Sequence, residues 1–286
     1  MHYEIEHWLT ESKYGEIATV ETLGGGCINE LSRLELRDGG SLILKKNHHA
    51  PDNFFAAEAT GLSALSNANA LRVPSVIHQG SNFLLLEDLG QGQPSATYWE
   101  QLGMGLAKLH NKEYPQFGFT ANNFCGETAQ DNTLYKDGFE FFANRRIRAL
   151  AKTGLEKKLL SSADMDDLDF IASRLAHWIP LQPAVLIHGD LWSGNIHCDN
   201  HGNPALIDPA TYWGWAEAEL AMTELFAGFD KRFYDSYANQ SAMGADWRER
   251  VPLYNLYHLL NHLLLFGNAY LAEIRNITAR FAKRNK

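Results

Sequence analysis

The segment 188–195, which reads HGDLWSGN, carries the residues best suited to chemistry, and the apolar run 184–187 leads into it. An Asp beside a hydroxyl group can orient it and accept its proton. An Asn carbonyl oxygen can bind a metal ion that bridges phosphates. The short loop between Asp190 and Asn195 lets both side chains point into one cleft. Asp, Gly and Asn also favour ordinary turns, so the segment alone leaves a plain turn open.

A second acidic residue, Asp208, ends a short apolar run thirteen positions after Asn195. An Asp followed by Asn at the fifth position, and then by an Asp after a short strand, matches the catalytic loop and the metal-binding segment of kinases. Asp190 is therefore the predicted catalytic base, and Asn195 and Asp208 are the predicted Mg²⁺ ligands. Pro209-Ala210 replace the Phe-Gly of protein kinases, which points away from that class.

A glycine-rich loop between two strand-like runs is predicted to cover the phosphates of ATP, because glycines let backbone N–H groups approach closely. A Walker A loop or a Rossmann fingerprint would lead into a helix, and this loop leads into a strand. An ordinary hairpin turn is the alternative reading. The residues of the loop are Gly24, Gly25, Gly26, Cys27, Ile28 and Asn29.

Lys45 on the third strand and Glu58 on the next helix form a candidate phosphate-binding pair, as in kinases. Lys46 is the neighbouring alternative. Since side chains alternate along a strand, only one lysine faces the cleft, and we expect Lys46 to face solvent. The fifth strand ends at a predicted hinge whose backbone groups would hold the adenine edge, at Glu87, Asp88 and Leu89.

The elements that must position these residues fall into two parts. Before residue 90, the patterns predict three strands, a helix at 54–68 and two more strands. The turn-rich stretch 90–94 is the predicted linker. Beyond it helical periodicity dominates, with a short β interruption between 185 and 208. The expected fold is α+β and two-lobed, with a small β-rich lobe (1–90) and a larger helical lobe (91–286), the layout of the protein-kinase-like fold. The helices expected after the linker are 98–110, 139–152, 164–178, 217–226, 251–266 and 269–283.

Composition and charge exclude several classes of function. The net charge of −9 argues against a nucleic acid or an anionic membrane as partner, because both need a basic patch. The N-terminus lacks the pattern of a signal peptide, and no run is long enough to span a bilayer. The cytoplasm is the expected location.

The cysteines and histidines show no metal-binding spacing. Cys27, Cys125 and Cys198 are odd in number and lack CxxC spacing, so they indicate neither a disulfide framework nor a zinc motif. His258 and His262 stand four apart, as in zinc proteases, but Leu259 replaces the Glu that should follow the first His. We expect these two histidines to be packing or surface residues.

Taken together, the motifs resemble the fructosamine-3-kinase (ketosamine kinase) family over nearly the whole chain. The Trp-Ser-Gly between Asp190 and Asn195 is the sharpest part of the match. The remaining matching segments are 24–29 (GGGCIN), 117–119 (FGF), 207–210 (IDPA), 219–226 (ELAMTELF) and 256–262 (LYHLLNH).

The resemblance implies a fold similar to that of aminoglycoside phosphotransferases and choline kinases. It also implies ATP- and Mg²⁺-dependent phosphorylation of the 3-hydroxyl of ketosamines, a deglycation step, with Lys45 binding phosphate. Trp192 is either a platform for the sugar or a packing residue under the loop. By the same resemblance, the acceptor is expected near His188, Trp192, Trp213, Trp215 and Glu217.

The chain departs from the family pattern in places. Many relatives carry Tyr-Gly-His-Arg-Glu where segment 213–217 reads WGWAE, and Asp where this chain has Glu219. These changes bear on substrate preference. We expect a monomer, and relatives with Cys in the glycine-rich loop imply a disulfide-linked dimer through Cys27 as the alternative state. The rival functions are a kinase for an aminoglycoside, choline or another metabolite, and a silent kinase fold acting as a redox-responsive binding module.

Overall fold

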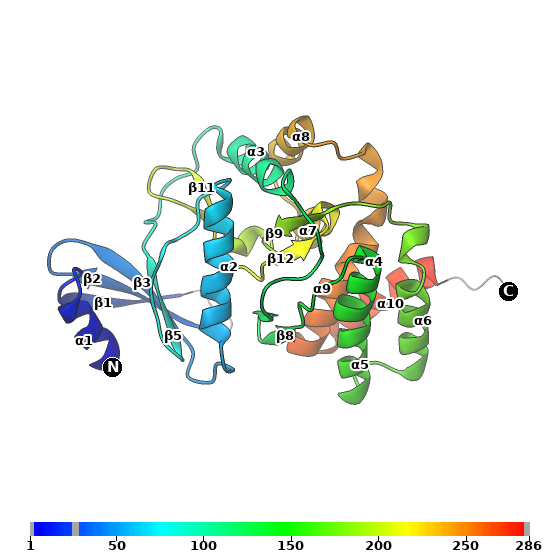
Figure 1. Ribbon diagram of the computed structural model, residues 1–286, viewed down its shortest axis with the longest axis horizontal. Helices are drawn as coiled ribbons and strands as arrows, with labels where there is room; N and C mark the ends of the chain where they lie inside the picture. The colour runs from blue at the N-terminus through cyan, green and yellow to red at the C-terminus, as the bar shows by residue number, and fades with distance from the viewer. Residues whose placement is uncertain (1–2, 25–28, 283–286) are drawn as a thin grey trace.

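The computed structural model describes residues 3–24 and 29–282, and its N-terminal part is a five-stranded antiparallel sheet. The strands lie in the order β1-β2-β3-β5-β4 (Figure 1). Helix α1 precedes the sheet and helix α2 follows its third strand. The elements are α1 (Tyr3–Glu11), β1 (Ile17–Leu23), β2 (Glu30–Leu36), β3 (Ser41–Lys46), α2 (Phe54–Ala68), β4 (Val76–Gln79) and β5 (Phe83–Glu87).

Strand β5 is covered on both faces, which explains its continuous apolar run, whereas the edge strand β1 is largely exposed. Phe83 and Leu85 point to a small core that includes Ile5 and Leu9 of α1. Leu84 and Leu86 point the other way and join the main core, together with Phe55 and Leu62 of α2. Helix α2 therefore lies between the sheet and the helical part of the chain (Figure 1). Because successive side chains of a strand point to opposite faces, the side chains of β5 are shared between two cores.

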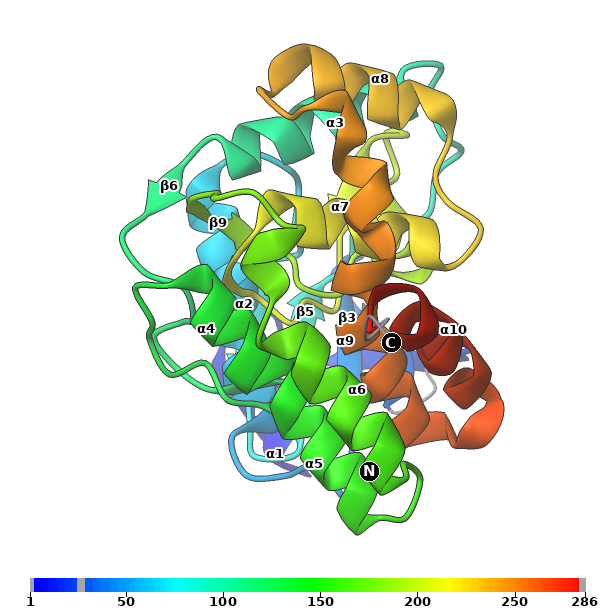
Figure 2. The same ribbon diagram turned by 90° about the vertical axis from the view of Figure 1, so that its right-hand side faces the viewer.

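The rest of the chain is mainly helical. Helix α9 is apolar over most of its surface and packs against α7, α5 and α10. Helices α3 and α8 pack together at one end of this part, whereas α5, α6 and α10 gather at the other (Figure 2). The α-helices are α3 (Tyr98–His110), α4 (Gly138–Phe141), α5 (Ala149–Glu156), α6 (Ser162–Ala172), α7 (Ala216–Leu225), α8 (Lys231–Gln240), α9 (Val251–Phe266) and α10 (Leu271–Phe281).

Short strands hold the segments that carry the candidate catalytic residues. Strand β9 pairs with β12 and β6 in one small sheet, and β10 pairs with β11 in another. The β7–β8 hairpin packs near α2 and α9. The bounds are β6 (Glu113–Tyr114), β7 (Asn123–Cys125), β8 (Thr128–Gln130), β9 (Ala184–Ile187), β10 (Ile196–Cys198), β11 (Pro204–Leu206) and β12 (Tyr212–Gly214).

Most of the predicted elements are present, with instructive exceptions. The helices predicted at 54–68, 98–110 and 251–266 have the predicted bounds. The helix predicted at 139–152 is interrupted by a π-helical stretch at 142–148. Helix α8 was not predicted, because it is polar overall and its buried face is carried by two aromatic residues four apart, Phe233 and Tyr237. In the described ranges, no helix is long and apolar enough to cross a bilayer.

Candidate active site

The segment 188–195 is named the catalytic loop. Glu219 of α7 holds its first residues in place through hydrogen bonds. The carboxylate of Glu219 accepts hydrogen bonds from the backbone N–H groups of His188 and Gly189, both at 2.8 Å. His110 Nε2 lies 3.2 Å from the same carboxylate. Burial raises the pKa of Glu219, but the hydrogen bonds and charges of His110 and His188 outweigh it and hold the pKa low. Glu219 is therefore a buried anion that fixes the start of the loop.

His188 ties the catalytic loop to the strand before Asp208. Its side chain is fully buried, and Nε2 donates to the carbonyl of Ile207 at 2.8 Å. Nδ1 accepts from the backbone N–H of Asp190 at 3.3 Å. Burial lowers the pKa of His188, which keeps it neutral and able to donate from one nitrogen while accepting at the other. His188 thus positions Asp190, and the prediction that it contacts substrate is wrong, because no part of its side chain reaches the surface.

Gly189 is required at its position for two reasons. Its φ is +85°, and a Cβ there would lie 2.2 Å from the carbonyl oxygen of Ala210. The backbone N–H of Ala210 donates to the carbonyl of His188 at 2.9 Å. The catalytic loop and the segment after Asp208 therefore touch along their backbones, which brings the three predicted polar residues together.

Asp190 has the environment of a catalytic base. Its side chain is 21% exposed, and Oδ2 accepts from Asn195 Nδ2 at 3.1 Å. Burial raises the pKa of Asp190 to about 7, Asp208 and Glu219 add to the increase, and the Asn195 hydrogen bond opposes it. A carboxyl with a raised pKa in a polar cleft is a strong candidate for proton transfer.

Lys45, Glu58 and Asp208 form one connected ion-pair network across the two parts of the chain. Lys45 Nζ donates to both Glu58 oxygens at 2.9 Å and to Asp208 Oδ1 at 2.8 Å. Burial lowers the pKa of Lys45, but the charges and hydrogen bonds of Asp208 and Glu58 raise it by more than burial lowers it. The net pKa is therefore above the ordinary value, and the lysine stays charged. The choice of Lys45 over Lys46 agrees with this geometry, although Lys46 is partly buried rather than fully exposed.

Asp208 adopts an uncommon backbone conformation for its residue type. Its φ is +55°, in the left-handed region, and Pro209 follows it directly. A residue before proline is disfavoured in helical conformations, so the surroundings must hold this one in place. Asn123 and Gln130 of the β7–β8 hairpin help, because their amides donate to the carbonyls of Thr211 and Ala210 at 2.8 and 3.3 Å. The Asp208 side chain is 42% exposed and available to a ligand.

Asn195 and Asp208 suit a hard divalent cation. The Asn195 amide nitrogen donates to the Asp190 carbonyl at 2.8 Å and to its carboxylate, which leaves the Asn195 side-chain oxygen for coordination. Asp208 adds an exposed carboxylate oxygen. Mg²⁺ prefers oxygen donors, with one or two carboxylates and substrate phosphates completing its shell. The donor set present here fits that ion.

The predicted nucleotide-binding segments are placed only in part. Of the glycine-rich loop, Gly24 and Asn29 are described, while Gly25, Gly26, Cys27 and Ile28 lie outside the described residues. At the predicted hinge, Glu87 forms an ion pair with Arg72, and Asp88 accepts from Arg33 at 2.7 Å.

The backbone of the hinge is also partly engaged. The Glu87 N–H donates to Ser75 at 2.9 Å, and the Leu89 carbonyl accepts from Asn200 at 2.9 Å. Adenine would therefore meet other backbone groups of the hinge.

Trp192 lies on the surface beside Asp190. Its side chain is 37% exposed, and its ring meets Phe226 edge to face at 5.9 Å. A Cβ at Gly194 would lie 2.4 Å from the indole, so Gly194 makes room for this ring. The sequence Trp-Ser-Gly therefore places an exposed aromatic ring on the surface beside the catalytic loop.

The aromatic surface continues outward from Trp192 along α9. Phe226 contacts His262 at 5.1 Å, and His262 contacts Phe266 at 5.5 Å and Tyr270 at 5.1 Å. Phe266 is 53% exposed. Residues Trp192, Phe226, His262, Phe266 and Tyr270 are called the aromatic wall below.

Three other residues predicted to contact the acceptor lie elsewhere. Trp215 is 3% exposed and packs among Phe117, Phe139, Phe142 and Tyr254 in the main core. Its assignment to the substrate is wrong, because the core encloses its ring.

Glu217 is also buried, and its two oxygens accept from Arg250 at 2.7 Å each. Its role is structural, so this assignment is wrong as well. Trp213 stacks on Tyr114 and lines a pocket of about 570 Å³ against α2, where none of the three polar catalytic candidates contributes. Of the residues that depart from the family pattern at 213–217, Trp215 is therefore enclosed in the core, and Trp213 borders a pocket.

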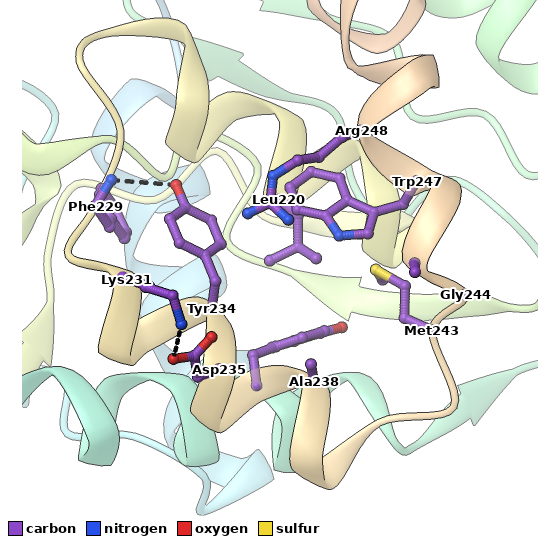
Figure 3. A pocket seen from close by; sticks show the side chains of 12 residues that line it. Leu220, Phe229, Lys231, Tyr234, Asp235, Ala238, Met243, Gly244, Trp247 and Arg248 are labelled. Carbon is purple, nitrogen blue, oxygen red and sulfur yellow. Dashed lines mark hydrogen bonds and ion pairs between the residues drawn. The ribbon is translucent and has the colours of Figure 1, made fainter.

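A second pocket lies between α7, α8 and the 3₁₀ segment 245–250, and no residue of the catalytic loop lines it. It has a volume of about 540 Å³, and Tyr234, Trp247 and Met243 line it (Figure 3). Its charged groups are engaged with each other or with the rim: Lys231 with Asp235, and Arg248 with Glu224. No group in it resembles a catalytic set, so a search for the site by cavity alone would mislead.

Sequence reasoning missed Glu219 and His110 as parts of the site. Glu219 had been read only as a departure from the Asp of relatives, and His110 ends a helix with no motif around it. The signal that could have found Glu219 is a carboxylate inside the apolar stretch 218–222, since a buried acid needs specific partners.

Comparisons with known proteins agree with this geometry. The family model for fructosamine kinase matches residues 1–284. A protein-ribulosamine 3-kinase of Arabidopsis thaliana is 34% identical over 96% of this chain and 86% of its own length. A protein of Synechocystis sp. named a probable ketoamine kinase is 37% identical over 87% of this chain and 85% of its own.

Solved structures give the same result for the fold. A Thermobifida fusca protein assigned to the fructosamine-3-kinases has a TM-score of 0.87 and 33% identity, over 98% of both chains. An aminoglycoside phosphotransferase solved with streptomycin and ATP has a TM-score of 0.65 at 14% identity, over 98% of this chain and 96% of its own, and shows the fold alone. The expected two-lobed, protein-kinase-like α+β fold is confirmed.

Proposed function

Because this chain belongs to the fructosamine kinase family, we propose that it transfers the terminal phosphoryl group of ATP to the 3-hydroxyl of a ketosamine, such as a fructosamine or a ribulosamine. The observation that carries the proposal is the proximity of Asp190, Asn195, Asp208 and Lys45, which come from distant parts of the chain. Phosphoryl transfer needs mainly positioning and charge neutralisation, and these residues supply both.

Asp190 orients the acceptor hydroxyl and takes its proton. Its neighbours prepare it for this role, because His188 and Glu219 fix the backbone of the loop while Asn195 holds one carboxylate oxygen. The raised pKa of about 7 brings the proton affinity of Asp190 close to the conditions under which a base works best. The other oxygen, Oδ1, remains for the hydroxyl.

Asn195 and Asp208 would hold Mg²⁺, which neutralises charge on the phosphates when bound. Lys45, held by Glu58, supplies a fixed positive charge for the ATP phosphates. Lys45 is also paired with Asp208, so the same lysine links the sheet to the segment that carries the candidate metal ligand. Glycines of the loop 24–29 would cover the phosphates.

The aromatic wall would receive the acceptor. The face of Trp192 is suited to the C–H groups of a sugar, and Asp190 stands two positions before it in the loop. The rest of the wall leads away from Asp190, on the side where the amine of the ketosamine would extend. We also predict that the chain is a monomer located in the cytoplasm. Its predicted lobes are residues 1–90 and 91–286.

The test is phosphoryl transfer from Mg–ATP to a panel of acceptors: a fructosamine, a ribulosamine, choline and an aminoglycoside. We expect a phosphorylated product with the ketosamines alone, with phosphorus on the 3-hydroxyl by NMR. Turnover of choline or the aminoglycoside without ketosamine turnover would keep the kinase chemistry and overturn the acceptor. No turnover of any acceptor, together with no Mg–ATP-dependent thermal stabilisation, would indicate a silent kinase fold.

A further inference from the structure

Three side chains of metal-binding type meet at Asp190 although they come from distant segments. Cys125 ends β7, Asp190 lies in the catalytic loop and His258 lies in the middle of α9. The Cys125 sulfur, an Asp190 oxygen and a His258 ring nitrogen all lie within 4.8 Å of one another. No spacing rule could reveal this group, because the three residues are separated by 65 or more positions in the chain.

His258 has a buried polar atom that no protein group satisfies. The residue is 5% exposed, and its Nδ1 atom has no hydrogen-bond partner. That atom lies 4.0 Å from Asp190 Oδ1, the carboxylate oxygen that Asn195 does not use. A buried nitrogen without a partner is costly, which indicates that a further species belongs between the two groups.

Cys125 completes the set with a soft donor. It is 2% exposed, and Asn261 Nδ2 donates to its sulfur at 3.3 Å and to its carbonyl at 3.2 Å. Burial raises the pKa of the thiol, and the nearby Arg146 guanidinium opposes that effect. Arg146 also repels a cation, but a Cys125 thiolate and the Asp190 carboxylate would together balance a dication.

We propose that Cys125, Asp190 and His258 bind a borderline-soft divalent ion of the Zn²⁺ type, and that the bound ion inhibits phosphoryl transfer. The sulfur, nitrogen and oxygen donors match Zn²⁺, whereas Mg²⁺ requires oxygen ligands. Three protein ligands leave a fourth tetrahedral position for water. Binding replaces the thiol proton by a metal–sulfur bond, and the proton leaves to solvent.

The required movement is small. Donors around tetrahedral Zn²⁺ lie about 3.3–3.7 Å apart at the usual bond lengths. The observed 4.0 Å between His258 and Asp190, and the 4.8 Å limit for the set, are larger by about an ångström or less. Asp190 borders the cleft and can make this shift. Inhibition rests on the proposed function, because an ion on Oδ1 occupies the group that should receive the hydroxyl proton.

The binding test uses the full chain without nucleotide and Co²⁺ as the probe. In a Cys27→Ser, Cys198→Ser background, Cys125 is the sole thiol. We expect one Co²⁺ per chain, a thiolate-to-cobalt charge-transfer band and the visible bands of a tetrahedral ion, all displaced by Zn²⁺. The charge-transfer band should vanish with Cys125→Ala. His258→Ala should weaken binding at least about tenfold, whereas the matched control His262→Ala, one turn along α9, should not.

The inhibition test measures Mg–ATP-dependent ketosamine turnover as Zn²⁺ is added, each variant being compared with itself without Zn²⁺. We expect the inhibitory Zn²⁺ concentration to rise at least about tenfold in His258→Ala and Cys125→Ala relative to His177→Ala, which alters an exposed histidine between α6 and β9. Equal inhibition in all of them would overturn the inhibitory role.

The two proposals can fail separately. Absence of the charge-transfer band in the single-thiol protein, which has no substitution at the site, would overturn the metal site. That result would leave ketosamine turnover untouched. Cobalt binding in a chain that phosphorylates no ketosamine would support the site and contradict the proposed function.

Discussion

A buried carboxylate and a partly exposed one serve the same loop in opposite ways. Glu219 lies under its start, accepts two backbone N–H groups and a His110 nitrogen, and has a lowered pKa. Asp190 lies at its open side, accepts from Asn195, and has a pKa raised to about 7. One acid is therefore a fixed anion that builds the loop, and the other is left short of partners.

The contrast shows how the chain separates structure from chemistry. A carboxylate that is fully satisfied cannot take a proton from a substrate near neutral pH, because its charged form is too stable. A carboxylate with few partners can take such a proton, but it lowers the stability of the fold. The fully satisfied carboxylate of Glu219 helps to offset this loss. If this account is right, substitutions on the two sides of the loop should separate activity from stability.

Apart from loss of Asp190 itself, the largest effect should come from the open side, with Asp208→Asn. We expect turnover to fall by roughly 10²–10³-fold or more, because the metal-binding charge is lost. The Mg–ATP-dependent rise in melting temperature should also disappear. The free energy of unfolding should fall only modestly, because the buried Lys45 loses one of its two carboxylate partners and keeps Glu58. Asp169→Asn, at an exposed ion pair with Arg148, is the control. A full Mg–ATP shift in Asp208→Asn would contradict the assigned ligand.

On the inner side, Glu219→Gln should damage stability as well as rate. The new amide would place N–H groups against the N–H groups of His188 or Gly189, which costs about 2–4 kcal/mol of unfolding free energy. Chemical denaturation and turnover, measured on the same samples, test this expectation. If the variant had normal stability and strongly reduced turnover, Glu219 would belong with the catalytic groups. That result would contradict the proposed difference in role between Glu219 and Asp190.

A smaller and more selective effect is expected for Trp192→Ala at the mouth of the cleft. Loss of the exposed ring should raise KM for the ketosamine about tenfold, equivalent to roughly 1.4 kcal/mol, while KM for ATP stays the same. Trp192→Phe, which keeps an aromatic face, should recover most of the loss. An equal rise in both KM values would indicate a packing role under the loop.

The smallest effect concerns a carboxylate remote from the loop. Asp164 caps α6 and accepts from Arg275 at 2.8 and 2.9 Å, and these bonds lower its pKa. Because the folded pKa lies below the unfolded value, the stabilisation is present above about pH 4 and fades as pH falls further.

The melting temperature of Arg275→Gln should therefore approach that of the parent chain between about pH 7 and about pH 3. A difference that is constant over this range would show that Asp164 is not the group that responds.

Local patterns predicted the parts of the fold that depend on neighbours in sequence. The apolar periodicities of α2, α3 and α9 located these helices to the residue. The spacing of Asp190, Asn195 and Asp208 was informative because one short stretch of backbone positions all three.

The remainder depends on contacts between distant segments. Nothing near Trp215 or Glu217 in the sequence indicates that the core and Arg250 enclose them. The partners of His188 and Glu219 are likewise set by tertiary packing.

The measurement that tests the central claim most directly is ketosamine turnover by Asp190→Asn, with its unfolding free energy determined in parallel. We expect turnover to fall by roughly 10²–10⁴-fold, because the base is lost, while stability is unchanged or higher because a poorly satisfied carboxyl is removed. Near-normal turnover on every ketosamine that the parent chain accepts would contradict the account, whatever the stability.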